Sequence, residues 1–173
     1  MLPNLTLVLG GAASGKSKFA ESLIVNSGLD RVYLATAEIR DEEMSLKIAA
    51  HRQQRGAGWT TIEAPLGVAE ALHRCPAGAA ILLDCATMWL SNVMLSGADP
   101  AAAEDALMAA LETAPGPVVV VSNELGQGVV PENALARRFR EAQGRLNQRL
   151  AAQAGLAVLV AAGLPLALKG RLP

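Results

Sequence analysis

The sequence predicts an α/β protein in which a mostly parallel sheet is flanked by helices on both faces. Short apolar segments alternate with amphipathic segments along the chain, as expected for parallel strands joined by helices. In addition, residues 10–17 form a glycine-rich segment between an apolar run and a helical pattern. The chain has 173 residues and no visible linker, repeat or low-complexity tract, so we expect a single domain over residues 1–173.

Apolar runs rich in β-branched residues predict the strands. Residues 5–9 read Leu-Thr-Leu-Val-Leu, residues 79–84 end in a carboxylate, and the four valines at 118–121 form the clearest buried strand. We expect residues 156–160 to be the last strand. The expected strands are residues 5–9, 31–36, 59–63, 79–84, 118–121 and 156–160.

Amphipathic periodicity, prolines and acidic starts predict the helices. A helical pattern runs from Lys16 to about residue 26, and acidic residues open a second one at 41–55. Pro65 opens a helix that ends before Pro76. The remaining helices are expected at residues 87–95, 100–112 and 131–153.

The composition limits the partners. The net charge is −1, and no basic stretch carries interleaved aromatics, so we expect no nucleic-acid partner. The apolar runs are strand-sized, so no membrane span is expected. The start of the chain has no charged leader, which favours a cytoplasmic protein.

The two cysteines carry no sign of a metal site. Cys75 and Cys85 form no metal-binding spacing, and Cys85 is interpreted as a small core residue in a strand.

Residues 10–17 read Gly-Gly-Ala-Ala-Ser-Gly-Lys-Ser and fit the spacing G-x-x-x-x-G-K-[ST]. Glycines let successive backbone N–H groups turn toward one anion, and the following helix adds its positive dipole end. Lys16 can reach the β- and γ-phosphates, and the Ser17 hydroxyl can ligate Mg²⁺. The predicted phosphate-binding residues are Gly10, Gly11, Ala12, Ala13, Ser14, Gly15, Lys16 and Ser17.

Asp84, at the end of an apolar strand, is the expected partner of this loop. In nucleotide sites such a carboxylate holds Mg²⁺ directly or through water. The alternative is a carboxylate that caps the helix expected from Thr87. We favour the metal role, because the residues before Asp84 are too apolar for a surface position.

The segment at residues 41–55 places His51 and Arg55 on neighbouring positions of one helical side, with Arg52 beside them. Arginine neighbours favour neutral imidazole, which can attack phosphorus while the guanidinium groups neutralise phosphate oxygens. Taken alone, however, a helical histidine beside arginines is more often part of a solvated face. His73, at an expected helix end, is interpreted as structural.

Two further segments are chemically informative. Residues 122–131 follow the valine strand at its carboxyl end, where open parallel sheets place ligands, and suit a substrate or phosphate loop. Any strand-to-helix connection has a similar composition, so this assignment stays open. The helix after this loop carries a basic face, for which phosphate binding or subunit contact is a hypothesis. Arg138 and Arg145, with Glu141 nearby, could equally form surface ion pairs that contribute little. The arginines of this helix are Arg137, Arg138, Arg140, Arg145 and Arg149.

Together these segments resemble the bifunctional adenosylcobinamide kinase/adenosylcobinamide-phosphate guanylyltransferase family of cobalamin biosynthesis. The phosphate loop alone is widespread, but its combination with the His51 segment and the Asn-Glu-x-Gly-x-Gly-x-Val-Pro run is specific. The resemblance extends from Leu5 to Lys169. It rests on residues 10–17, 33–37, 41–44, 51–52, 55, 59–63, 82–90, 92, 122–131, 136–140, 144–148 and 163–165.

The resemblance implies two reactions. ATP or GTP first phosphorylates the aminopropanol hydroxyl of adenosylcobinamide. GMP from GTP is then transferred to that phosphate through a GMP–histidine intermediate, giving adenosylcobinamide-GDP and pyrophosphate. The matching histidine is His51, and the resemblance reverses its interpretation as part of a solvated face. A RecA-like P-loop NTPase fold and a homotrimer are also implied. Besides residues 10–17, the implied nucleotide contacts are Ala35, Thr36, Ala37, Arg52, Gln53, Gln54, Arg55, Glu63 and Asp84.

The sequence departs from the family pattern at three positions. Ala13 stands where many members carry an arginine, Lys47 stands where arginine is usual, and Asp84 stands where some members have glutamate. A methyl group at position 13 cannot make the phosphate or subunit contact of a guanidinium. From the residues alone, two alternatives stay open: another small-molecule P-loop kinase, and a nucleotide-binding module without turnover.

Overall fold

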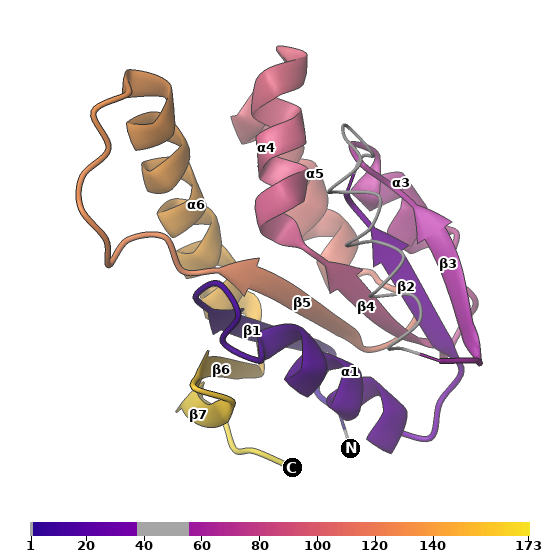
Figure 1. Ribbon diagram of the computed structural model, residues 1–173. Coiled ribbons are helices and arrows are strands. Elements are labelled where there is room, and N and C mark those ends of the chain that lie inside the picture. The colour runs from indigo at the N-terminus through magenta and orange to yellow at the C-terminus, as the bar shows by residue number, and fades with distance from the viewer. Residues whose placement is uncertain (1, 38–55) are drawn as a thin grey trace.

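A computed structural model describes residues 2–37 and 56–173 of the chain. Within these residues, strands β1 to β7 form one sheet in the spatial order β3-β2-β4-β5-β1-β6-β7 (Figure 1). Every neighbouring pair is parallel except β6 and β7, which are antiparallel. The predicted mostly parallel sheet is therefore confirmed. The helix expected at residues 41–55 lies outside the described residues.

The six predicted strands are all present. Their observed bounds are β1 Leu5–Gly10, β2 Arg31–Ala35, β3 Trp59–Glu63, β4 Ala80–Asp84, β5 Val118–Asn123 and β6 Leu156–Ala161. The expectation that the strands end near residue 160 is wrong, because β7 follows at Leu164–Lys169. Ala162 and Gly163 connect β6 to β7, and both have positive φ angles, 51° and 78°. A two-residue turn with two positive φ angles matches the twist of a hairpin and is favoured there.

The helices of the described residues begin with α1 at Lys16–Asn26. Two helices start later than predicted: α3 begins at Val68 rather than Pro65, and α6 begins at Ala134 rather than Pro131. In α6 the reason is the side chain of Asn133, which accepts hydrogen bonds from the N–H groups of the first turn. The other bounds are α3 Val68–His73, α4 Ala86–Ser96, α5 Pro100–Glu112 and α6 Ala134–Gln153.

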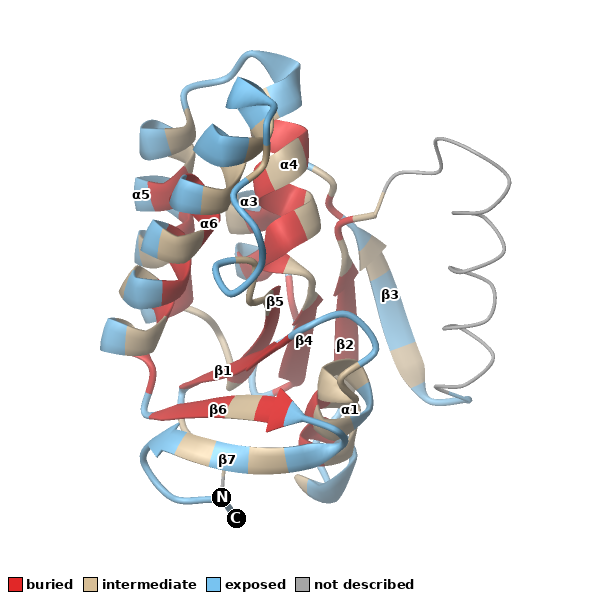
Figure 2. Cartoon of the chain, turned by 60° about the vertical axis from the view of Figure 1, so that its left-hand side comes forward, coloured by how far each residue is buried: buried red, intermediate tan, exposed pale blue. Residues whose placement is uncertain are grey.

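Helices cover both faces of the sheet, as predicted. Alternate residues of β1 point to opposite faces: Leu7 packs in the cluster with α3, α4, α5 and α6, whereas Val8 packs in the cluster with α1. Figure 2 shows the central strands almost entirely buried between these layers. Such burial on both faces explains why β4 and β5 read as continuous apolar runs.

The helices rise beyond the carboxyl edge of the strands, most visibly α4 and α6 (Figure 1). The loops that follow β1, β4 and β5 open at this edge. Among the described residues, no helix is long and apolar enough to cross a membrane. The carboxyl edge is thus where the predicted site residues should meet.

Candidate nucleotide-binding site

The phosphate loop joins β1 to α1, as its spacing predicted. Gly10 is the last residue of β1, and a Cβ atom there would meet the Ser14 side chain and lie 2.7 Å from the carbonyl oxygen of Val160. Gly15 has a φ angle of 92° and immediately precedes α1. Glycine is therefore required at Gly10 by contact and favoured at Gly15 by backbone conformation.

The turn of the β6–β7 hairpin contacts the backbone of the phosphate loop. The Gly163 N–H donates to the carbonyl oxygen of Ser14 at 2.8 Å. A Cβ atom on Gly15 would lie 3.1 Å from the Cα atom of Gly163, so the two backbones are in close contact. The side-chain oxygen of Ser14 is buried and has no partner among the described residues. Sequence reasoning missed this support because the hairpin itself was not predicted.

Two residues of the loop differ in how the structure places them: Lys16 is hydrogen-bonded to the loop, and Ala13 is exposed. The ammonium group of Lys16 donates to the carbonyl oxygen of Gly11 at 3.1 Å, so it curls over the loop where phosphates would lie. Ala13 is exposed and has a φ angle of 53°, a left-handed conformation that disfavours residues with a Cβ atom. The exposed position of Ala13 is one from which a longer side chain would point into solvent or toward a neighbouring molecule.

Asp84 ends β4, which is separated from β1 only by β5. Its Oδ2 atom accepts a hydrogen bond from the hydroxyl of Tyr33 at 2.8 Å. The alternative role as a helix cap is wrong: Cys85 is the N-cap of α4, and its sulfur accepts from the N–H of Met88. Cys85 accordingly lies just after β4, not inside the strand as predicted, although it is half-buried against the core.

Electrostatics connect the phosphate loop to this strand end. Burial raises the pKa of the Cys85 thiol to about 11, and the negative charge of Asp84 acts in the same direction. The positive charge of Lys16 acts to lower that pKa, so its field reaches the end of β4. Lys16 and the Asp84–Cys85 segment therefore belong to one electrostatic environment.

Thr36, predicted as a nucleotide contact, has a structural role in the described residues. It is buried; its hydroxyl donates to the carbonyl oxygen of Cys85 at 2.9 Å and accepts from the Cys85 N–H at 2.8 Å. Asn92 of α4 donates to the Thr36 carbonyl at 2.8 Å. Ala35 and Ala37 flank Thr36 and are half-buried, and Glu63 is exposed at the end of β3. These residues line up along the carboxyl ends of β2 and β3.

A buried polar network holds the carboxyl end of β5, next to the phosphate loop. Asn123 pairs with Gly10 across the sheet. Its N–H donates to the Thr87 hydroxyl of α4 at 2.8 Å, and its carbonyl accepts from Asn147 of α6 at 3.0 Å. Buried Gln143 donates to Ser122 Oγ at 2.8 Å and to Asn147 Oδ1 at 2.9 Å. Sequence reasoning missed Gln143 and gave Asn147 no role beyond its place in the family resemblance; their signal is a polar pair at i, i+4 on the otherwise apolar face of α6.

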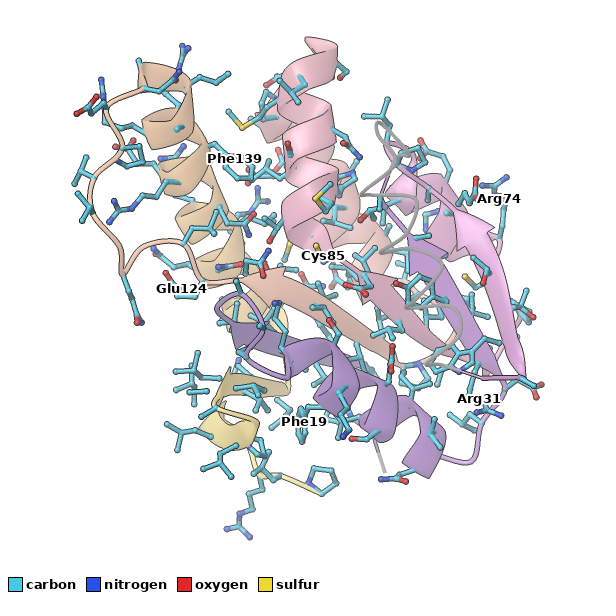
Figure 3. All side chains as sticks on the ribbon, in the orientation of Figure 1. Phe19, Arg31, Arg74, Cys85, Glu124 and Phe139 are labelled. Carbon is cyan, nitrogen blue, oxygen red and sulfur yellow. The ribbon has the colours of Figure 1, made fainter. Side chains whose placement is uncertain are left out.

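The loop after β5 is held by arginines. Arg140 donates to the carbonyl oxygens of Gly126 and Val129, and Arg137 donates to those of Pro131 and Glu132. The N–H of Glu124 donates to the Gly10 carbonyl at 3.1 Å, so the loop starts beside the phosphate loop. Figure 3 shows Glu124 at the edge of the sheet near that loop. Arg137 and Arg140, two of the five arginines on the predicted basic face, thus hold this loop through hydrogen bonds to its backbone.

Arg149, another of these arginines, forms ion pairs with α5. Its guanidinium lies 3.2 Å from Glu104 Oε2 and 2.6 Å from Asp105 Oδ1. The hydrogen bond that Arg149 donates to Asp105 is the main cause of its raised pKa, and burial opposes it. This arginine therefore ties α6 to α5 through one buried and one exposed carboxylate.

The structure brings the phosphate loop, Asp84 and residues 35–37 to one sheet edge. The predicted residues that lie outside the described part of the chain are His51, Arg52, Gln53, Gln54 and Arg55. His73 is the last residue of α3, and its Nε2 atom lies 3.2 Å from the Thr113 hydroxyl, in keeping with a structural role.

The donor set at this edge fits a Mg²⁺ ion. The Ser17 hydroxyl is on the first turn of α1, and Asp84 offers a carboxylate two strands away. The described residues contain no group of three or more His, Cys, Asp or Glu side chains placed to hold a metal. Mg²⁺ with a nucleotide needs only one or two protein oxygens, because phosphates and waters complete its octahedron.

The glycine-rich loop ahead of the first helix, together with a carboxylate ending a nearby parallel strand, defines an α/β protein of the P-loop nucleotide-binding class. Residues 6–168 match the family described as cobinamide kinase / cobinamide phosphate guanyltransferase. The chain belongs to this family, and the resemblance inferred from the sequence is confirmed.

Curated relatives agree with this assignment. The chain is similar to the bifunctional adenosylcobalamin biosynthesis protein CobP of Pseudomonas aeruginosa, at 45% identity over 95% of this chain and 96% of the relative. It is also similar to proteins named CobU, at 39% identity in Escherichia coli and 42% in Salmonella typhimurium, covering 95% of this chain and 99% of each.

Solved structures support the fold. A type III secretion ATPase of pathogenic bacteria superposes with a TM-score of 0.56 at 13% identity, over 95% of this chain and 57% of that one. The flagellar accessory protein FlaH of Methanocaldococcus jannaschii gives a TM-score of 0.50 at 12% identity, over 99% and 80%. At these identities the likeness concerns the fold alone.

Proposed function

We propose that this protein phosphorylates adenosylcobinamide with ATP or GTP and then transfers GMP from GTP to the product, forming adenosylcobinamide-GDP. The observation that supports this proposal most is the family match over residues 6–168. The phosphate loop, supported by the β6–β7 hairpin, adds a site for the nucleotide that both reactions need.

In the kinase reaction, the terminal hydroxyl of the aminopropanol arm attacks the γ-phosphorus and releases a nucleoside diphosphate. The proton of the hydroxyl passes to solvent or to a phosphate oxygen. Lys16 moves from the Gly11 carbonyl to the phosphate oxygens and stabilises the charge that builds up there. Such reactions depend mainly on positioning and charge neutralisation, so no general base is assigned.

In the transfer reaction, a neutral nitrogen of His51 attacks the α-phosphorus of GTP, and pyrophosphate leaves. A phosphate oxygen of adenosylcobinamide phosphate then attacks the GMP–histidine, which frees the imidazole and forms the diphosphate. Arg52 and Arg55 neutralise phosphate oxygens in both steps, and Gln53, Gln54, Glu63 and residues 35–37 contribute nucleotide contacts. Two covalent steps spare the enzyme from holding two polyanions in contact at once.

Ser17 and Asp84 would hold a Mg²⁺ ion, which lowers the charge repulsion between the phosphates and the attacking group. The hydrogen bond that Tyr33 donates to Asp84 supports this proposal, because it restrains the carboxylate at the end of β4. We further propose that the chain works as a cytoplasmic homotrimer without a nucleic-acid partner, in keeping with its net charge of −1. Sedimentation of the purified protein tests the trimer, and a monomeric mass would contradict it.

The chain has two histidines, which allows a matched test of the intermediate. The protein is incubated with GTP labelled at the α-phosphate. We expect a covalent label that is acid-labile and alkali-stable, absent from His51→Ala and retained by His73→Ala. A label that persists in His51→Ala would refute the role of His51.

Nucleotide consumption tests the remaining alternatives. We expect sustained, multiple-turnover consumption of nucleotide only when cobinamide is added; without it, consumption stops once His51 carries the covalent GMP. If cobinamide is phosphorylated but no GMP label forms on the protein, the kinase activity would be supported and the guanylyltransferase activity contradicted. No consumption with cobinamide would contradict both activities and favour a binding module.

A further inference from the structure

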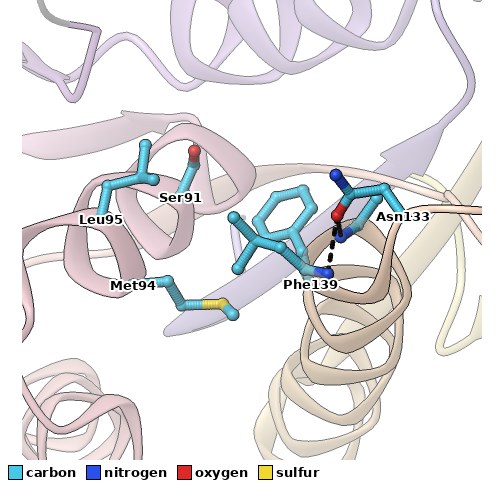
Figure 4. A pocket seen from close by; sticks show the side chains of 7 residues that line it. Ser91, Met94, Leu95, Asn133 and Phe139 are labelled. Atoms are coloured by element: carbon cyan, nitrogen blue, oxygen red, sulfur yellow. Dashed lines mark hydrogen bonds between the residues drawn. The ribbon is translucent and has the colours of Figure 1, made fainter.

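A cavity of about 310 Å³ lies between the second half of α4 and the first turns of α6 (Figure 4). Met94 and Leu95 line it from α4, and Ala136 and Phe139 line it from α6. Leu95 is 55% exposed although it is large and apolar, because the cavity opens to solvent. Concave, mainly apolar sites of this size are typical of small-molecule binding.

Two polar groups face the same cavity. Ser91 brings its hydroxyl to the lining from α4. The amide oxygen of Asn133 caps α6 by accepting from the N–H groups of Leu135 and Ala136, at 2.8 and 3.2 Å. This capping leaves the Asn133 NH₂ group available. A few such groups in an apolar pocket orient a ligand and give specificity.

Both walls of the cavity are anchored at the nucleotide edge. Thr87 on α4 and Asn147 on α6 bind the two backbone groups of Asn123, which pairs with Gly10. The helices run from that anchor to the cavity, and Figure 1 shows them adjacent beyond the carboxyl edge of the sheet. A molecule held in the cavity is therefore presented over the same edge as the phosphate loop.

The chemistry of the cavity selects its occupant. Among the described residues, no charged side chain lines it, so it does not suit the phosphates of a nucleotide. The acceptor named in the family description, cobinamide, is a corrin ring with a periphery of methyl groups and neutral amides. Methyl groups match the apolar walls, and amides can accept from and donate to Ser91 and Asn133.

We infer that the cavity between α4 and α6 is the corrinoid subsite, which takes the methyl-bearing edge of the ring while the aminopropanol arm extends toward the phosphate loop. This inference rests on the proposed function. It adds the residues that recognise the acceptor, and these lie on elements different from those that hold the nucleotide.

The test fills the cavity in the full-length protein. Ala136→Trp occupies the space, and Ala134→Trp, on an exposed position of the same helix outside the cavity, is the matched control. Cobinamide and GTP are each titrated by calorimetry. We expect Ala136→Trp to weaken cobinamide binding at least about tenfold, with GTP affinity unchanged, and Ala134→Trp to match the wild type.

Cobinamide affinity equal to wild type in folded Ala136→Trp would overturn the subsite. If that variant does not fold, cobinamide affinity is measured in Leu95→Ser instead, because this exposed residue tolerates a smaller polar side chain. Unchanged cobinamide affinity in Leu95→Ser would also overturn the subsite. Failure of the wild type to bind cobinamide, or to use nucleotide in its presence, would instead contradict the proposed function. The two failures are thus distinguishable.

Discussion

The loops after β1 and β5 start side by side at one edge of the sheet but are held in different ways. The phosphate loop is held by backbone: glycines allow close contacts, and the Gly163 N–H binds the Ser14 carbonyl. The loop after β5 is held by side chains, because Arg137 and Arg140 donate to its carbonyl oxygens. In the first arrangement glycines let backbone N–H groups turn toward an anion, whereas the second satisfies carbonyls and leaves Val129 and Val130 exposed.

The two cations that touch these loops illustrate the difference. Lys16 makes one exposed hydrogen bond, to Gly11, that a phosphate can replace. Arg140 bridges two carbonyl oxygens and has a structural task. We therefore expect removal of Lys16 to affect chemistry and removal of Arg140 to affect local order.

The largest expected effect is on Lys16→Met. Loss of the ammonium group should lower kcat/KM by about 100-fold or more in both reactions, because charge on the transferred group is no longer stabilised. The melting temperature should stay close to wild type. Steady-state kinetics and thermal unfolding check this, and retained activity would remove Lys16 from the catalytic set.

Gly10→Ala tests the backbone contacts of the phosphate loop. The added Cβ atom would meet Ser14 and the Val160 carbonyl, so the free energy of unfolding should fall by about 1–3 kcal/mol. Gly11→Ala is the control, since nothing lies within 4 Å of a Cβ atom there. Denaturant titration measures both, and equal effects would contradict the packing argument.

Arg140→Ala tests the arginine-held loop. Two hydrogen bonds are lost at an exposed site, so stability should fall by only about 0.5–1.5 kcal/mol, while residues 124–133 become more accessible to protease. Arg138→Ala, an exposed position on the same helix, should leave the cleavage rate unchanged. Identical cleavage of both variants would show that Arg140 does not order the loop.

The smallest effect is expected for Ala13→Gly. Relief of the left-handed conformation contributes about 1 kcal/mol, and the greater freedom of unfolded glycine offsets about half of it. The net change should be a stabilisation below about 1 kcal/mol, measured by chemical unfolding. A clear destabilisation would mean that the Ala13 methyl group makes a favourable contact.

The backbone-held loop was predictable and the rest of its surroundings was not. Glycine spacing directly encodes a backbone shape, so residues 10–17 were recognisable as a phosphate loop. The β7 strand was missed because Gly163 and Pro165 resemble the end of a sheet, although an edge strand tolerates proline. The Gln143 and Asn147 contacts depend on how α6 packs against β5, and sequence periodicity does not encode that distance.

Asp84 shows the same limit on a smaller scale. Its place at the end of an apolar strand was correctly predicted, but its hydroxyl partner Tyr33 lies on β2 and is adjacent only after the sheet forms. The N-cap of α4 is Cys85, and cysteine is uncommon at that position. Local sequence preference therefore located the carboxylate without identifying its neighbours.

The bond between Gly163 and Ser14 means that the nucleotide-binding unit is discontinuous in the chain. A fragment that ended before the β6–β7 turn would carry the complete glycine-rich motif, α1 and the central strands, yet it would lack the donor that fixes the back of the loop. During synthesis, the motif is therefore made long before its last structural partner. We therefore expect nucleotide binding to depend on folding of the β6–β7 hairpin, so that it can serve as a check on folding in truncated or fused forms.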